Sequence, residues 1–163
     1  MKLRDAKVQL VLAQKNIDDE AIVQSCVNAF VSLARSVTFV MQSESGSDTP
    51  LALWYRTQMD GLGQIPLLKF FNDRRVHSIH KGTVTLRKTA FSVFGTQRSA
   101  EGNVIFSPQT ATGWLFENTS QFNLPSSASG IWLCHEYVKV LEKLVLEWSH
   151  RMNRPEIRGG PLG

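Results

Sequence analysis

Residues 18–41 read DDEAIVQSCVNAFVSLARSVTFVM, and this stretch holds the clearest periodic pattern in the chain. Apolar residues recur there at intervals of three and four, as they do along one face of an α-helix. We expect Asp18 to cap this helix, with Asp19 and Glu20 in a first turn where the helix dipole favours negative charge. The pattern predicts a helix buried along most of its length. Its core-facing positions, with three that widen the apolar stripe, are Val23, Val27, Phe30, Ala34, Val37, Met41, Cys26, Leu33 and Val40.

Similar patterns on both sides of this stretch predict four further helices. One precedes it, and two follow it behind Pro50 and Pro66, since proline is favoured at the first helical position. Gly61 and Gly63 end the first of these two. A long last helix follows the possible N-caps between Pro125 and Ser129. Apolar positions that define the helices before Pro66 and the last helix are Leu3, Ala6, Leu10, Ala13, Leu51, Trp54, Tyr55, Met59, Trp132, Leu133, Val138, Leu141, Leu144, Val145 and Trp148.

The pattern changes between Thr83 and Gln121, where apolar residues alternate with polar ones and β-formers are frequent. Gly95, residues 99–103 and Pro108 supply turn signals, so we expect two or three short antiparallel strands. The predicted fold is therefore mainly α: a helical up-and-down bundle with a short antiparallel β insertion before the last helix.

Length and composition predict a single domain. With 163 residues, 42% of them apolar, the chain can bury one sizeable core. We expect that domain to cover residues 1–152, with the β-rich insertion at about 83–121. Residues 153–163 contain two prolines and three glycines and show no burial pattern, so we expect a flexible C-terminal tail.

Charge and cysteine content suggest a cytoplasmic protein with an anionic partner. The net charge of +4 is a mild excess that favours a partner such as RNA. Cys26 and Cys134 are too few for a disulfide framework and lie in apolar helical patterns, so we expect buried free thiols in a reducing compartment. Charged residues at the N-terminus argue against a signal peptide, and no apolar run approaches the roughly 18 residues of a membrane span.

The stretch NDRRVHSIH, residues 72–80, is the best candidate for chemistry. Guanidinium and imidazole groups together can hold a phosphodiester and move its protons. In the alternative interpretation these are solvated side chains at a helix end, where the helix dipole favours cations.

The order of the helices and two motifs resemble the HEPN (higher eukaryotes and prokaryotes nucleotide-binding) superfamily. Its RNase-like members carry Arg, then four to six residues, then His, and Arg75-Val76-His77-Ser78-Ile79-His80 fits with four intervening residues. Ala34-Arg35-Ser36-Val37-Thr38-Phe39 is similar to the core-facing run of that bundle's first long helix. The resemblance covers about residues 19–150. Val76 stands where the family commonly has a polar residue, often Asn.

This resemblance implies a metal-independent endoribonuclease, of the toxin type, in which the motifs of two subunits meet at a dimer interface. His80 would be the acid/base, and Arg75 would clamp the phosphate with its planar fork. Arg74 and His77 share a helix face and are candidate accessory phosphate contacts. Asp73 either orients an imidazole or pairs with Arg74, and the ion pair is favoured. The expected partners are a second copy of the chain, an RNA substrate, and an antitoxin or nucleotidyltransferase, and no cofactor is expected.

Two other functions stay open at this point. One is a non-catalytic HEPN-like module for oligomerisation or for binding nucleic acid or a partner protein, which the valine at position 76 favours. The other is a metal site inside the bundle, because His77 and His80 can share a helix face and His135-Glu136 on the last helix could complete it.

Overall fold

The computed structural model describes residues 2–47, 49–80, 84–98 and 104–153; of residues 77–80, 92–98 and 104–109 it describes the backbone alone. The described chain is mostly helical, with a two-stranded antiparallel sheet before the last helix, which confirms the predicted fold class. In chain order the elements are α1 (Lys2–Lys15), α2 (Glu20–Glu44), α3 (Pro50–Leu62), α4 (Pro66–His80), β1 (Leu86–Arg98), β2 (Val104–Phe116), the 3-10 helix η1 (Thr119–Phe122) and α5 (Gly130–Met152).

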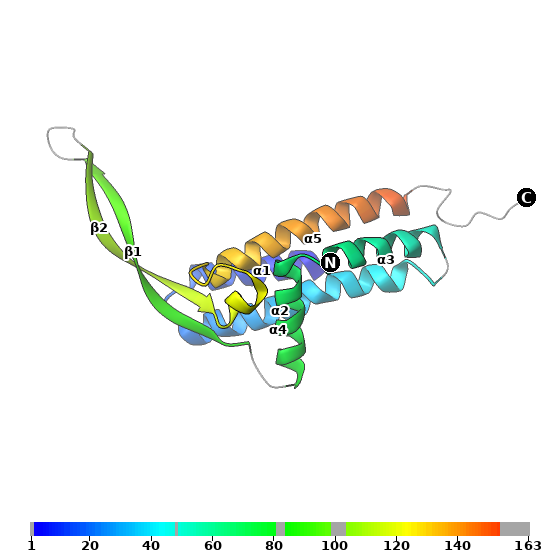
Figure 1. Ribbon diagram of the computed structural model, residues 1–163, viewed down its shortest axis with the longest axis horizontal. Helices are drawn as coiled ribbons and strands as arrows, with labels where there is room; N and C mark the ends of the chain where they lie inside the picture. Colours follow the sequence, from blue (N-terminus) through cyan, green and yellow to red (C-terminus); the bar gives the residue numbers. More distant parts are fainter. Residues whose placement is uncertain (1, 48, 81–83, 99–103, 154–163) are drawn as a thin grey trace, which may run out of the picture.

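The helices form one bundle around a shared core. Helices α1, α2, α3 and α5 run along the long axis of the molecule, whereas α4 crosses them (Figure 1). Helix α2 contacts α1, α3, α4 and α5. Phe30 of α2 packs edge-on against Phe71 of α4, with ring centroids 6.0 Å apart, and Phe71 stacks on Tyr137 of α5. These aromatic contacts join three helices at the centre of the core.

Helix α2 is the core helix that the sequence predicted, but its N-cap residue and the burial of Val40 differ from the prediction. Its N-cap is Asp19 rather than Asp18, because the Asp19 carboxylate accepts a hydrogen bond from the N–H of Ile22 at 3.0 Å. Val40 is 37% exposed, although we expected it to widen the buried stripe. It lies one position from Met41, and a step of one residue turns the helix by about 100° away from the core.

Helix α2 is also long and apolar enough to cross a membrane, by length and composition alone. This corrects the expectation that no segment of the chain could do so. In the folded chain, 44% of its apolar window is buried against the other elements. A core helix of this length meets the same criterion, so the finding does not place the chain in a membrane.

The last helix confirms its predicted apolar side with one exception. Leu133, Leu141 and Leu144 are buried, and Ser129 caps the helix by accepting a hydrogen bond from the N–H of Trp132. Trp132 itself is 51% exposed, because it lies one position off the buried face. The expected flexible tail after residue 152 lies, apart from Asn153, outside the described residues.

The β insertion is one long ribbon rather than several short strands. Strands β1 and β2 are 13 residues each and pair without a break from Leu86 opposite Phe116 to Arg98 opposite Val104. Gly95 and Pro108, which we expected to form turns, lie inside the strands. Both strands of a two-stranded ribbon are edge strands, where a proline can be accommodated because one side of each strand needs no partner. The ribbon projects from one end of the bundle (Figure 1).

The base of the ribbon is fastened to α2 by side-chain hydrogen bonds. The N–H of Val84 donates to Oδ1 of Asn28 at 2.7 Å, and the N–H of Leu86 donates to Oε1 of Gln24 at 2.9 Å. Trp114 of β2 is 1% exposed and belongs to the main core. The ribbon therefore starts from a fixed position on the bundle.

Candidate functional site

The first half of α4 anchors the helix in the core. Phe70 and Phe71 are 0% and 2% exposed. The Phe70 ring lies edge-on to Phe116 at 5.1 Å and to Phe122 at 5.5 Å. These contacts fix the direction in which the second half of α4, with its charged cluster, leaves the core.

Asp73 and Arg74 form the ion pair that the sequence favoured. Nη2 of Arg74 donates to Oδ2 of Asp73 at 2.9 Å. The Arg74 guanidinium also lies 5.2 Å from the ring centroid of Phe70, and the residue is only 8% exposed. Its Nε is buried without a hydrogen-bond partner in the described structure. We expected Arg74 to be an accessory phosphate contact. Instead, its side chain is buried against Phe70 and paired with Asp73.

Arg75, by contrast, faces a surface cavity. The cavity is about 330 Å³ in volume and is lined by Ser32, Arg35, Ser36, Phe39 and Arg75; we call it the α2–α4 cavity. Both arginines are half-buried, and neither forms an ion pair with any described carboxylate. Two guanidinium groups without counter-charges favour an anion between or beside them.

His77 and His80 belong to α4 by their backbone, but their side chains lie outside the described part of the chain. The helix continues through His80. Positions 75 and 80 are therefore about 140° apart around the helix axis. Side chains at these two positions of one chain leave the helix in different directions. If Arg75 and His80 are to act on the same phosphate, one of them is best supplied by a second subunit.

The proposed metal ligands are not seen together. His135 lies on α5, where its Nε2 atom is buried without a hydrogen-bond partner among described groups. In the parts of the chain whose side chains are described, no three His, Cys, Asp or Glu side chains gather as metal ligands would. The other two histidines of that hypothesis, His77 and His80, fall outside those parts.

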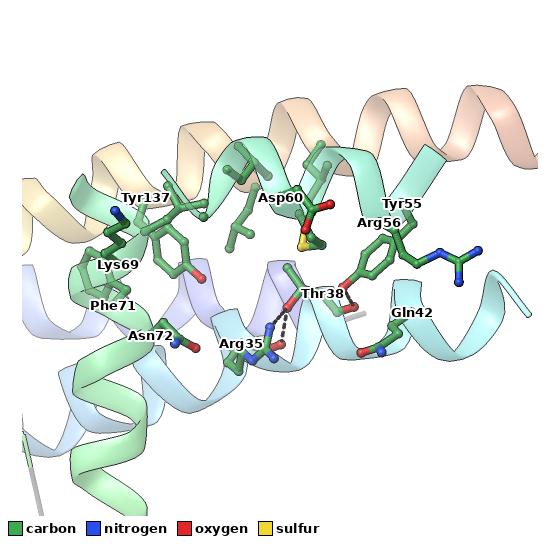
Figure 2. Close-up of a pocket in the computed structure, with 16 residues that line it drawn as sticks. Arg35, Thr38, Gln42, Tyr55, Arg56, Asp60, Lys69, Phe71, Asn72 and Tyr137 are labelled. Atoms are coloured by element: carbon green, nitrogen blue, oxygen red, sulfur yellow. Dashed lines mark hydrogen bonds between the residues drawn. The ribbon is translucent and has the colours of Figure 1, made fainter. Parts of the chain in front are cut away.

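A second and larger cavity lies between α2, α3, α4 and α5; we call it the four-helix cavity. Its volume is about 460 Å³. Arg35 lines it as well as the α2–α4 cavity. Nη1 of Arg35 donates to Oγ1 of Thr38 at 2.7 Å, and the Tyr55 hydroxyl donates to the carbonyl oxygen of Thr38 at 2.8 Å (Figure 2). These bonds hold Arg35 and Tyr55 in place on the cavity wall.

Burial affects the two tyrosines that line this cavity. It raises the pKa of Tyr137 to about 12, against the opposing effect of the nearby Arg35 charge. Burial also raises the pKa of Tyr55. Both hydroxyls are therefore neutral hydrogen-bond donors at physiological pH.

The two cysteines are free and buried, as predicted. Burial raises the pKa of the Cys26 thiol, and it raises the pKa of the Cys134 thiol well above its usual range. Thiols held in the protonated form are poor nucleophiles, so neither cysteine is a candidate for catalysis.

Arg35 and Tyr137 are the site residues that sequence reasoning missed. Arg35 stands among the apolar residues of α2, directly after a core alanine, where an uncompensated charge is unusual. Tyr137 lies four residues before Leu141 on the buried face of α5, so its hydroxyl must enter the interior. These two signals could have marked both residues, but neither shows that they meet at one cavity.

Comparison with known proteins adds no family: no protein-family model, curated protein or solved structure matches this chain.

Proposed function

We propose that this protein is a metal-independent endoribonuclease that resembles the HEPN nucleases and acts as a cytoplasmic homodimer. One observation carries the proposal: Arg35 and Arg75 line one surface cavity, and their guanidinium groups have no carboxylate partners in the described structure. An RNA phosphodiester supplies the missing negative charge, and the planar fork of arginine can bond two phosphate oxygens at once.

The chemistry assigns different tasks to the two ends of the motif. Arg75 holds the phosphate and stabilises the charge that builds on it as the RNA 2′-hydroxyl attacks. His80 takes or gives the proton. Ser32 lines the same cavity and can add a hydroxyl donor to the phosphate oxygens, whereas the hydroxyl of Ser36 already donates to the carbonyl oxygen of Ser32 at 2.9 Å.

Dimerisation can bring together an arginine and a histidine that lie on different sides of one helix. Two-fold symmetry brings the Arg75 of one subunit near the His80 of the other if the ends of α4 meet at the axis. Phe39 lines the α2–α4 cavity together with Arg75, and Val76 follows Arg75 in the sequence. Phe39 is 64% exposed and Val76 is 44% exposed, so they provide apolar area for such a contact. A protein that stays monomeric at micromolar concentration counts against this arrangement.

The test is cleavage of single-stranded RNA in the presence of EDTA. We expect the wild type to cut and to leave a cyclic phosphate or 3′-phosphate end, and His80→Ala to lose about 10²–10⁴-fold in rate while staying folded. Arg75→Lys should also be impaired, because an ammonium group keeps the charge but loses the two-point grip. Arg4→Lys, on the exposed face of α1, is the matched control and should cut normally.

Two results would contradict the proposal that this protein is an endoribonuclease. Cleavage that persists in His80→Ala would point to a contaminating nuclease or to other residues. RNA binding that depends on salt, without cleavage by any form, would favour the non-catalytic binding module instead.

A further inference from the structure

The four-helix cavity has the size and position of a small-molecule site. Its volume of about 460 Å³ falls in the range typical of ligand pockets. It is separate from the end of α4, where the proposed RNA chemistry lies, although Arg35 borders both cavities. Its wall combines polar side chains with an apolar group, which is Met59, Leu62, Leu68, Phe71, Leu141 and Leu144.

One hydroxyl in this wall makes no hydrogen bond within the described part of the chain. Tyr137 is 7% exposed, and its ring is held by stacking on Phe71 with centroids 4.5 Å apart and planes inclined by 6°. Its hydroxyl points into the cavity (Figure 2) and makes no hydrogen bond to any described residue. Tyr55, on the opposite side, uses its hydroxyl on the Thr38 carbonyl oxygen. The fixed and unused donor of Tyr137 thus suits an acceptor atom of a ligand.

The charges around the cavity favour one negative group. Arg35 is half-buried, lines the cavity, and donates from Nη1 to Thr38, which leaves other N–H groups of its guanidinium for a ligand. Lys69 and Arg56 are exposed side chains at the rim, and the Arg56 guanidinium extends away from the cavity (Figure 2). Asp60 is exposed and also lines the cavity. A ligand with several negative charges would place some of them near Asp60.

We propose that the four-helix cavity binds a small monocarboxylate with an apolar body, such as a medium-chain fatty acid. The carboxylate accepts hydrogen bonds from the Arg35 guanidinium and from the Tyr137 hydroxyl, and the side-chain amide of Asn72 lies on the same wall. The apolar body contacts the leucine and methionine side chains of the cavity. This arrangement removes an unpaired charge and an unused donor and buries apolar surface at the same time.

Isothermal titration calorimetry with octanoate tests the proposal, and octanamide serves as a neutral probe of the same length. We expect octanoate to bind the wild type and octanamide to bind at least about tenfold more weakly, since the charge-assisted bonds are lost. Tyr137→Phe keeps the ring stack and should weaken octanoate about tenfold, and Arg35→Gln should weaken it further. Arg4→Gln, on the exposed face of α1 and away from the cavity, is the matched control for the arginine change, and it should stay within about twofold.

Three results would overturn the proposal: no octanoate binding at millimolar concentration, equal binding of octanoate and octanamide, or unchanged affinity in Tyr137→Phe. A fourth result, tighter binding of adenosine monophosphate than of octanoate, would overturn the assignment to monocarboxylates. Thermal melting of each variant shows whether it is folded, and Tyr137→Phe keeps the test decisive if Arg35→Gln does not fold. None of these measurements requires RNA cleavage, so the cavity and the proposed nuclease can fail independently.

Discussion

Two adjacent arginines of α4 lie in opposite environments. Phe70 and Phe71 anchor the helix, and Arg74 lies back over the Phe70 ring in an ion pair with Asp73. One residue later, Arg75 faces a surface cavity and has no described carboxylate partner. A step of about 100° around the helix axis separates a structural arginine from one available to a ligand. Charge alone therefore does not mark a binding residue; burial and partners decide its role.

The largest effect should come from removing the anchor. Phe70 is fully buried among three aromatic rings, so Phe70→Ala should cost about 3–5 kcal/mol in the free energy of unfolding. Urea denaturation measures this change. Leu53→Ala, at a position that is 62% exposed on α3, should change stability by no more than about 0.5 kcal/mol. Equal losses in both variants would show that α4 is not anchored as described.

A smaller loss is expected at Arg74. Arg74→Ala removes the ring contact with Phe70 and the ion pair with Asp73, and it should lower the free energy of unfolding by about 1–2 kcal/mol. Arg74→Met keeps much of the apolar stem and removes the buried Nε that has no partner, so it should cost less than Arg74→Ala. The same urea experiment compares the two. If Arg74→Ala is as stable as the wild type, Arg74 has no structural role and the contrast with Arg75 is lost.

The sequence predicted the helices well because each buries one periodic apolar stripe. The stripe of α2, from Val23 to Met41, is one example. A local signal was also enough for the start of α4, which begins at the predicted Pro66. The ribbon was harder to predict, because Gly95 and Pro108 are turn signals in most contexts but are tolerated in paired edge strands.

The candidate site was predicted only in part. The pattern Arg75 to His80 marks a cation and an imidazole on one helix, but the difference between Arg74 and Arg75 depends on where α4 crosses α2. That crossing is set by long-range contacts such as Phe30 with Phe71. Arg35 and Arg75 line one cavity only because of the same crossing, since 40 residues separate them in the chain. Local periodicity carries no information about such a meeting.

RNA binding by the two single-arginine variants tests the assignment of Arg75 most directly. Fluorescence anisotropy with labelled single-stranded RNA at several salt concentrations gives both the Kd and its salt dependence. We predict that Arg75→Ala keeps the stability of the wild type, weakens RNA binding about tenfold at low salt, and flattens the slope of log K against log salt by about 0.7. Folded Arg74→Ala should bind RNA as the wild type does. Unchanged affinity in Arg75→Ala, or an equal loss in both variants, would contradict the account.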